Sequence, residues 1–290
     1  MTATAEVLAR CSFPPAGSHV TCAVSGGADS LALLVLGVER GCEVTAVHVD
    51  HRLRPASGRE AALVADVAAR WGAAFRSVVV EVAHGADLEA RARRARYDAL
   101  PADVLTGHTA DDQAETVLLN LLRGAGLDGL TGFDPIRRPL RRLRRRDTHK
   151  LCAGLGIQPF HDPSNDDPRF RRNRVRHELL PLLDAIAERD VAAVLARQAD
   201  HLRADADLLD ELSRSLDPTD ARALAAAPVP LAARAVRRWL RTGPEQHPPD
   251  AATVARVLAV ARGEATGCEV GGGLVVRRRA QRLYVADRAG

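Results

Sequence analysis

The feature that most constrains the fold is an alternation of short β-branched segments with longer amphipathic ones between residues 19 and 122. The alternation predicts four strands and three helices, in the order His19–Val24, Asp29–Glu39, Val44–Val49, Ser57–Trp71, Phe75–Val80, Asp87–Leu100 and Val104–Thr106. Strands that alternate with helices form βαβ crossovers, so we expect an α/β fold with a parallel twisted sheet and helices on both faces. Ligands of such sheets bind at the carboxyl ends of the strands.

A different pattern follows Pro181 and indicates a second domain. Its apolar spacing predicts one long helix, two shorter helices and a terminal hairpin, at Val191–Leu216, Pro230–Leu240, Ala251–Ala261 and Leu274–Val276 with Leu283–Val285. We therefore expect a catalytic domain over residues 1–185 and a smaller, mainly helical domain over residues 186–290.

Composition excludes several classes of protein. No apolar run approaches the ~20 residues that span a bilayer, and the amino terminus lacks the order of a secretory signal, so we expect a cytoplasmic protein with no membrane partner. The five cysteines are scattered and form no CxxC pair, which argues against a disulfide framework or a zinc site. Of the 41 basic residues only Lys150 is a lysine, so the net charge of +4 says little about a polyanionic partner unless the arginines cluster.

The segment Ser25-Gly-Gly-Ala-Asp-Ser30 lies where the first strand passes into the first helix. Glycines at such a bend let backbone N–H groups turn inward, and the helix that follows adds its positive dipole end, so the bend suits a phosphate. It has neither the lysine of a Walker A loop nor the spacing of a dinucleotide GxGxxG motif. Asp29 would repel a phosphate unless a cation lay between them, and Mg²⁺ is the natural mediator.

This segment resembles the signature of the PP-loop ATP pyrophosphatases, which cleave ATP between its α and β phosphates. Three further stretches resemble the tRNA(Ile)-lysidine synthetase family, namely His48-Val-Asp-His-Arg-Leu-Arg54, Thr106-Gly-His-Thr-Ala-Asp-Asp-Gln-Ala-Glu-Thr116 and Asp162-Pro-Ser-Asn with Asn173-Arg-Val-Arg176. The resemblance covers roughly residues 18–185. It implies ATP and Mg²⁺ as cofactors, with L-lysine and an isoleucine tRNA that has a CAU anticodon as partners. It also implies that an adenylated wobble cytidine is converted to lysidine, with release of AMP and pyrophosphate.

The resemblance and the chemistry together give the expected ATP and metal residues. The ATP-binding residues would be Ser25, Gly26, Gly27, Ala28, Asp29, Ser30 and His51, with Asp29 also as the metal ligand. His51 belongs to the second strand's end, with Arg52 standing where the family has a smaller residue, and it could contact adenine or ribose or be structural. Whether the chain is a monomer or a homodimer is left open.

Acidic residues gather on a helix that is expected to begin near Ala110. Asp111, Asp112 and Glu115 crowd one helical face, which destabilises a helix unless a cation lies among them. Following the family pattern, Asp112 and Glu115 would bind the ammonium group of the substrate lysine and accept its proton. The alternative is an ordinary solvated first turn, favoured by the helix dipole.

Arginines are expected to handle the anions. Arg176 would stabilise the α-phosphate or the leaving AMP, unless it belongs only to a tRNA-facing surface. Other arginines would contact tRNA: Arg93, Arg96, Arg144, Arg145, Arg146, Arg171, Arg172 and Arg174. Residues 137–150 include no aromatic residue that could stack on a base, so contacts there would be to phosphates. Arg93 lies four residues from both Glu89 and Tyr97, and this segment could hold lysine or RNA or be an ordinary surface ion pair.

Two other functions fit part of the pattern. A tRNA thiolation enzyme of the same superfamily would need cysteines in the site motifs, and none of the five lies there. A non-catalytic RNA-binding protein could retain the loop as a relic, but the intact loop together with Asp112 and Glu115 argues against it. The sequence therefore predicts an ATP-dependent ligase that acts on tRNA.

Overall fold

The computed structural model describes residues 3–50, 57–80, 91, 95, 98–241 and 249–287. The chain forms two compact units, residues 1–201 and 202–290, which are described separately below. The long helix α10 (Val191–Arg214) contains the point at which they divide. The expected boundary near residue 185 between a catalytic and a tRNA-binding domain stays a prediction.

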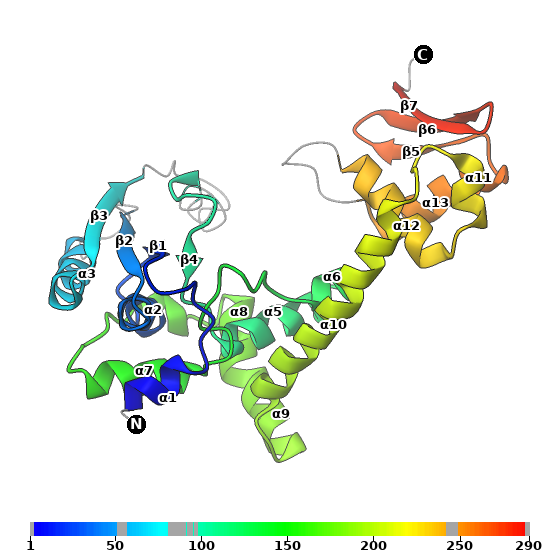
Figure 1. Cartoon of the computed structure of the whole chain (residues 1–290). Coiled ribbons are helices and arrows are strands. Elements are labelled where there is room, and N and C mark those ends of the chain that lie inside the picture. Colours follow the sequence, from blue (N-terminus) through cyan, green and yellow to red (C-terminus); the bar gives the residue numbers. More distant parts are fainter. Residues whose placement is uncertain are drawn as a thin grey trace. The chain divides into compact units, whose positions relative to one another are not determined.

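The N-terminal unit is built on a four-stranded parallel sheet with the order β3-β2-β1-β4. Its strands are β1 (His19–Ala23), β2 (Glu43–Asp50), β3 (Ala74–Val79) and the two-residue β4 (Leu105–Thr106). The predicted α/β class and parallel sheet are confirmed (Figure 1). The crossover helices α2 (Ala28–Glu39) and α3 (Ser57–Trp71) begin and end within one residue of the prediction. The helix expected at residues 87–100 lies almost wholly outside the described residues.

The main hydrophobic core lies between this sheet and helix α2. Four leucines of α2 are fully buried because the helix packs on β1 and β2 and also against α3 and α7 (Arg145–Gly154). Side chains alternate across a strand, so Ala46 joins this core whereas Val47 joins a second cluster with Leu100 and Val104. Both faces of the sheet are therefore packed, and the carboxyl ends of its strands are left as the place for a ligand.

Several short helices follow β4 in this unit. They are α5 (Ala110–Leu122), α6 (Leu127–Leu130), α7, the 3₁₀ helix η1 (Pro163–Asp166), α8 (Arg171–Arg174), the π-helical turn η2 (Val175–Leu179) and α9 (Leu180–Ala187), while α1 (Ala3–Leu8) precedes the sheet. Helix α7 was not predicted, because its residues were interpreted only as a basic run. It contacts α2 along one side, and this contact brings the arginines at its start to the site.

The C-terminal unit has its own small core. Helices α11 (Ala221–Ala226), α12 (Val229–Leu240) and α13 (Ala251–Arg262) pack around Val257 and Val276. The chain ends in an antiparallel sheet of β5 (Gly267–Gly271), β6 (Leu274–Arg279) and β7 (Arg282–Asp287). The predicted hairpin is confirmed as β6 and β7, and β5 adds a third strand that the sequence did not indicate.

Candidate active site

The Ser25–Ser30 loop joins β1 to α2 at the carboxyl edge of the sheet. Gly26 has φ +77°, a conformation that L side chains rarely adopt. The backbone N–H of Ser25 donates to Ser30 Oγ at 3.1 Å, and that hydroxyl donates to the Gly27 carbonyl at 2.9 Å. Gly27 gives α2 no side-chain cap, and the Ser30 N–H donates to the Gly27 carbonyl, so the N–H groups of the first two helical residues, Ala28 and Asp29, are the ones that face a ligand at the loop. The loop thus has the form of an anion cradle.

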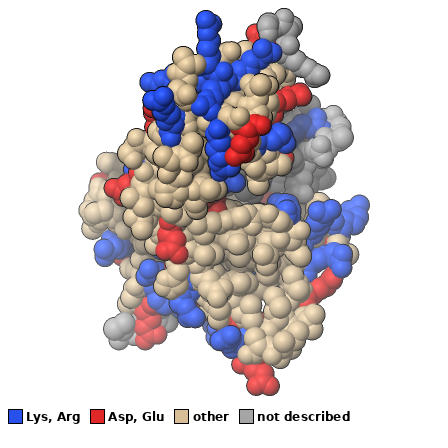
Figure 2. Space-filling view, turned by 90° about the vertical axis from the view of Figure 1, so that its right-hand side faces the viewer, with Lys and Arg blue, Asp and Glu red and all other residues tan. Residues whose placement is uncertain are grey.

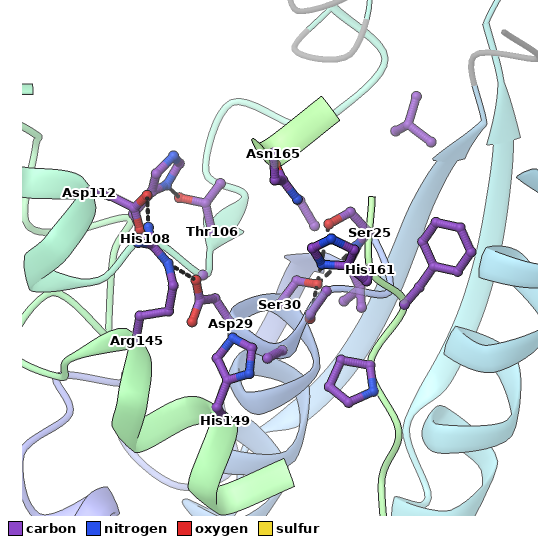
Figure 3. A pocket seen from close by; sticks show the side chains of 18 of the residues that line it. Ser25, Asp29, Ser30, Thr106, His108, Asp112, Arg145, His149, His161 and Asn165 are labelled. Carbon is purple, nitrogen blue, oxygen red and sulfur yellow. Dashed lines mark hydrogen bonds and ion pairs between the residues drawn. The ribbon is translucent and has the colours of Figure 1, made fainter. Parts of the chain in front are cut away.

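A cleft of about 650 Å³ opens over this loop, a volume typical of small-molecule sites. One part of its lining is apolar and includes Val24, Val47, Val49, Leu100 and Phe160. The other part is polar and includes Asp29, His108, Asp112, Arg145 and Arg176, several of which Figure 3 shows in close-up. An apolar wall next to a phosphate-type loop and charged groups matches the shape of a nucleotide.

Asp29 stands on the first turn of α2 and points toward α7. Its carboxylate accepts a hydrogen bond from Thr148 Oγ1 and lies 3.5 Å from Arg145 Nε (Figure 3). Burial, and next the charge of Asp112, raises the pKa of Asp29 to about 6. Asp29 is half-buried, and a cation would stabilise its ionised form.

Helix α5 begins with the predicted acids, and Asp112 caps its start. One carboxylate oxygen of Asp112 accepts from the Thr109 backbone N–H at 2.8 Å and from the Thr109 hydroxyl at 3.0 Å. The other accepts from Arg145 Nη2 at 3.0 Å and Arg172 Nη2 at 3.2 Å. Burial alone would raise the pKa of Asp112, but Arg145, His108 and Arg172 outweigh it and hold the pKa well below its usual range.

Glu115, one turn further along α5, has no exposed surface at all. Its carboxylate binds three arginines, at 2.6 Å to Arg172 Nε, 2.7 Å to Arg176 Nε and 3.2 Å to Arg145 Nη2. Glu115 does not line the cleft, whereas Arg145 and Arg176 do. In this state the residue expected to bind lysine is covered by guanidinium groups.

Asp111 takes a different direction from the other two acids. It binds Arg144 Nη2 at 2.8 Å and accepts from the Arg145 backbone N–H at 2.7 Å. We use the name acid–arginine cluster for eight residues, namely Asp29, Asp111, Asp112, Glu115, Arg144, Arg145, Arg172 and Arg176. Arg145 lies at its centre, since its guanidinium contacts Asp29, Asp112 and Glu115.

The arginines expected to bind tRNA do not share one environment. Arg144, Arg145 and Arg172 are occupied by carboxylates of the cluster. Arg146 is 66% exposed and Arg171 is exposed, while the exposed Arg174 pairs with Glu178 at 2.9 Å. His51, Arg93 and Arg96 lie outside the described residues.

Some residues of the cleft had no expected role. His108 follows β4, and His149, His161 and His177 line the cleft from α7, from the segment before η1 and from η2. His108 could have been found, because it lies just beyond the end of β4, at the ligand edge of the sheet. Nothing in a run of consecutive arginines distinguishes Arg145 from its neighbours.

The residues present fit Mg²⁺ with ATP. Among the described residues no group of three or more histidine, cysteine or acidic side chains is arranged to hold a metal ion by itself. Mg²⁺ is commonly bound by one or two carboxylates together with substrate phosphates, so a single acid beside a phosphate cradle suffices. Asp29, near the end of the Ser25–Ser30 loop, meets this requirement.

Comparisons with known proteins agree with this geometry. Residues 2–183 match the family model of a PP-loop domain, and residues 220–284 match that of a TilS substrate binding domain. A tRNA(Ile)-lysidine synthase from Rhodococcus erythropolis is 44% identical over 291 residues, which cover 92% of this chain and 89% of that protein. The chain belongs to the tRNA(Ile)-lysidine synthase family. A second family member, from Nocardia farcinica, is 42% identical over 301 residues and covers 96% of this chain and 94% of its own.

A solved structure adds information on the fold alone. The U34-tRNA thiolase NcsA from Methanococcus maripaludis, which has a [4Fe-4S] cluster, matches with a TM-score of 0.53 over 69% of this chain and 77% of its own. The identity is 16%, so the match supports the PP-loop architecture and not a shared reaction. In this lysidine synthase family member, burial raises the pKa of Cys11 and Cys22 to about 12, and no cysteine is among the residues that line the cleft.

Proposed function

We propose that this chain attaches L-lysine to C2 of the wobble cytidine in the CAU anticodon of isoleucine tRNA. ATP is spent in forming an adenylated cytidine, and AMP and pyrophosphate are released. The observation that carries the proposal is the match to lysidine synthases over more than nine-tenths of the chain. It is supported by a cleft that joins a phosphate-type loop to an acidic helix start.

The Ser25–Ser30 loop would bind ATP in the first half-reaction, which forms the adenylated cytidine. Its backbone N–H groups and the start of α2 would hold the phosphates, and Asp29 would hold Mg²⁺, which neutralises the phosphates when it is bound. The apolar wall around Val47 and Leu100 would receive the adenine. His51 stays a prediction for this subsite.

The acid–arginine cluster would bind lysine in the second half-reaction. A lysine ammonium has to replace a guanidinium at Asp112, the acid of α5 that lines the cleft. Arg176 lines the cleft and is held by Glu115, so it is placed to stabilise the α-phosphate or the departing AMP. Glu115 would then act mainly by positioning arginines, in addition to the lysine contact expected from the sequence.

The tRNA would be bound by exposed arginines through its phosphates. Arg146, Arg171 and Arg174 are exposed on the N-terminal unit, and Arg277, Arg279 and Arg282 are exposed on β6 and β7. Figure 2 shows Lys and Arg side chains gathered at the top of one face, the height at which Figure 1 draws these strands. We propose that residues 1–185 carry the catalysis and residues 186–290 bind tRNA.

The setting and assembly of the enzyme are proposals as well. None of the described helices is long and apolar enough to cross a membrane. We propose that the enzyme works in the cytoplasm, where its three substrates occur. A homodimer is a prediction that sedimentation equilibrium would test.

The proposal is tested by lysine-dependent AMP release with a purified isoleucine tRNA that carries CAU. Mass spectrometry of the digested tRNA should show cytidine 34 converted to lysidine. Methionine tRNA with the same anticodon serves as the control and should stay unmodified. AMP release without lysine incorporation would refute the function, and incorporation of sulfur would favour the thiolation alternative.

A further inference from the structure

One wall of the cleft has a carboxylate to which the proposed reaction gives no ligand. Among the described residues that line the cleft, the acids are Asp29, Asp112 and Asp166. Asp29 would hold Mg²⁺ and Asp112 would bind lysine, which leaves Asp166 at the end of η1, directly after the Asp162-Pro-Ser-Asn stretch. A carboxylate accepts hydrogen bonds and attracts positive charge, so the ligand of Asp166 should supply a donor or a cation.

Helix η1 is held beside the ATP loop by hydrogen bonds on both sides of it. Before η1, the Phe160 backbone N–H donates to the Gly26 carbonyl at 2.9 Å. On the other side, the side-chain nitrogen of the buried Asn173 donates to the carbonyls of Ser164 at 2.8 Å and Asp167 at 2.9 Å. The segment that bears the third acid is therefore fixed both to the ATP loop and to α8.

Two histidines lie next to the Asp166 carboxylate. Oδ2 lies 2.8 Å from His161 Nε2, and Oδ1 lies 3.8 Å from His177 Nε2. An ionised carboxylate only accepts hydrogen bonds, so His161 Nε2 carries the proton of the shorter contact and orients the group. The longer contact is beyond hydrogen-bond distance, and the Asp166 side chain is 58% exposed. Oδ1 can therefore accept a hydrogen bond from a ligand in the cleft.

The wobble base is the substrate group that has to approach this wall. Figure 3 shows His161 and Asn165 on the Ser25 side of the cleft, with Asp112 and Arg145 on the opposite side. In adenylation, O2 of the cytosine must reach the α-phosphate of an ATP held at the Ser25–Ser30 loop. The Watson–Crick edge that bears O2 also bears the N4 amino group, and proteins recognise unpaired RNA bases on this edge. Carboxylates accept from N4 of cytosine, whereas uracil has a carbonyl oxygen there, which a carboxylate repels.

We propose that Asp166 recognises the N4 amino group of the wobble cytosine and stabilises the cation that forms when this base is adenylated, an inference that rests on the function proposed above. O2 forms a bond to the α-phosphorus while the bond from that phosphorus to the oxygen shared with the β-phosphorus breaks, and its electron pair leaves with pyrophosphate. The neutral ring thereby gains a positive charge that N3 and N4 share. A carboxylate at N4 binds the adenylated base more tightly than the neutral one, and such differential binding accelerates the step.

The test removes the amine and the carboxylate separately and together. ATP labelled in the α-phosphate loads label onto the tRNA, and lysine capture then releases it as AMP, so the tRNA-dependent sum of both reports adenylation. One substrate is isoleucine tRNA with cytidine 34, and the other has pyrimidin-2-one there, which keeps O2 but has hydrogen in place of the amine. The amine also donates electrons to the ring, so its loss should slow adenylation in every enzyme.

The inference concerns the size of this penalty in each enzyme. The penalty should be about tenfold or more smaller in Asp166→Ala than in the wild type, because a carboxylate contact to cytosine N4 is lost only once. Asp166→Asn, whose amide oxygen accepts without a charge, should lie between the two. Asp167→Ala is the matched control, because Asp167 is the neighbouring acid, is not among the residues that line the cleft and pairs with the exposed Arg169 at 2.6 Å. It should show the wild-type penalty.

Two outcomes would overturn the inference. An equal penalty in the wild type and in Asp166→Ala would mean that the carboxylate does not contact the amine. Complete loss of adenylation of both tRNAs by Asp166→Ala would mean that Asp166 is needed for a substrate without an amine, and therefore supports ATP binding or the local fold. A wild-type enzyme that does not adenylate cytidine 34 would instead refute the proposed function itself.

Discussion

Replacing Glu115 with glutamine should destabilise the N-terminal unit strongly. The side chain is fully buried, and three arginines converge on its carboxylate. Glutamine removes the charge and turns an amide donor toward guanidinium donors, which leaves Arg172 and Arg176 with Asp112 as their remaining anion, at 3.2 and 3.9 Å. Removing one partner of a buried ion pair costs about 3–5 kcal/mol. Because these arginine side chains are 20–31% exposed and can turn toward water, we expect the lower end, about 3 kcal/mol.

Tryptophan fluorescence can report on this unit alone. The chain has two tryptophans, of which Trp71 packs on the N-terminal core and Trp239 on the C-terminal one. In a Trp239→Phe background, urea unfolding followed through Trp71 should therefore show a large fall in midpoint for Glu115→Gln. Glu178→Gln is the matched control, because Glu178 is 53% exposed in its pair with Arg174, and it should leave the midpoint unchanged.

The result that would refute the reasoning is specific. An unchanged midpoint for Glu115→Gln, together with normal loading of label and a selective loss of lysine capture, would mean that Glu115 contacts the substrate directly. The arginine pairs seen in this structure would then not describe the working site.

Three further substitutions test other parts of the site. The pKa of Asp29 is raised to about 6, so the folded protein binds this proton more tightly than the unfolded chain, and ionisation of Asp29 lowers the free energy of unfolding as pH rises from 4 to 6. Asp29→Asn should therefore stabilise the ligand-free protein at pH 8 and much less at pH 4. The same variant should lose all thermal stabilisation by Mg²⁺ with ATP, and a retained shift in melting temperature would exclude the metal role. Gly107→Ala should weaken ATP binding more than tenfold in calorimetry, because the added Cβ overlaps the Asp29 backbone, whereas Gly154→Ala, which meets open space, should bind normally. Arg146→Ala should lower the salt slope of tRNA binding by about one, and an unchanged slope would exclude a phosphate contact.

The spacing of apolar residues predicts correctly those helices and strands that bury one continuous face. Helix α3 begins and ends where its apolar spacing predicts, and the loop at Ser25–Ser30 lies at the expected sheet edge. Strand β5 was missed because glycines flank its short apolar stretch, so only pairing with β6 makes it a strand. Helix α1 has too few residues to show a period.

The partners of the charged residues could not be predicted in the same way. Arg144, Arg145 and Arg146 are identical in type and adjacent, yet the first binds Asp111, the second enters the cleft and the third faces solvent. The residue at which α7 begins and the packing of α7 on α2 determine the environment of each arginine. Both depend on tertiary structure, which the local sequence does not show. The sequence pattern therefore indicates the acids and Arg176, but it assigns Arg144, Arg145 and Arg172 to tRNA, whereas in the structure they bind carboxylates of the cluster.

The acid–arginine cluster should couple the two small substrates of the proposed reaction thermodynamically. Each guanidinium group of the cluster is paired with a carboxylate, so a cation that enters must release an arginine, and a released arginine is available to an anion. Binding of lysine and binding of ATP should then favour each other, and linkage requires the factor to be the same in both directions. Under the proposed function neither substrate alone would find the site ready, and ATP hydrolysis without lysine should therefore be slow.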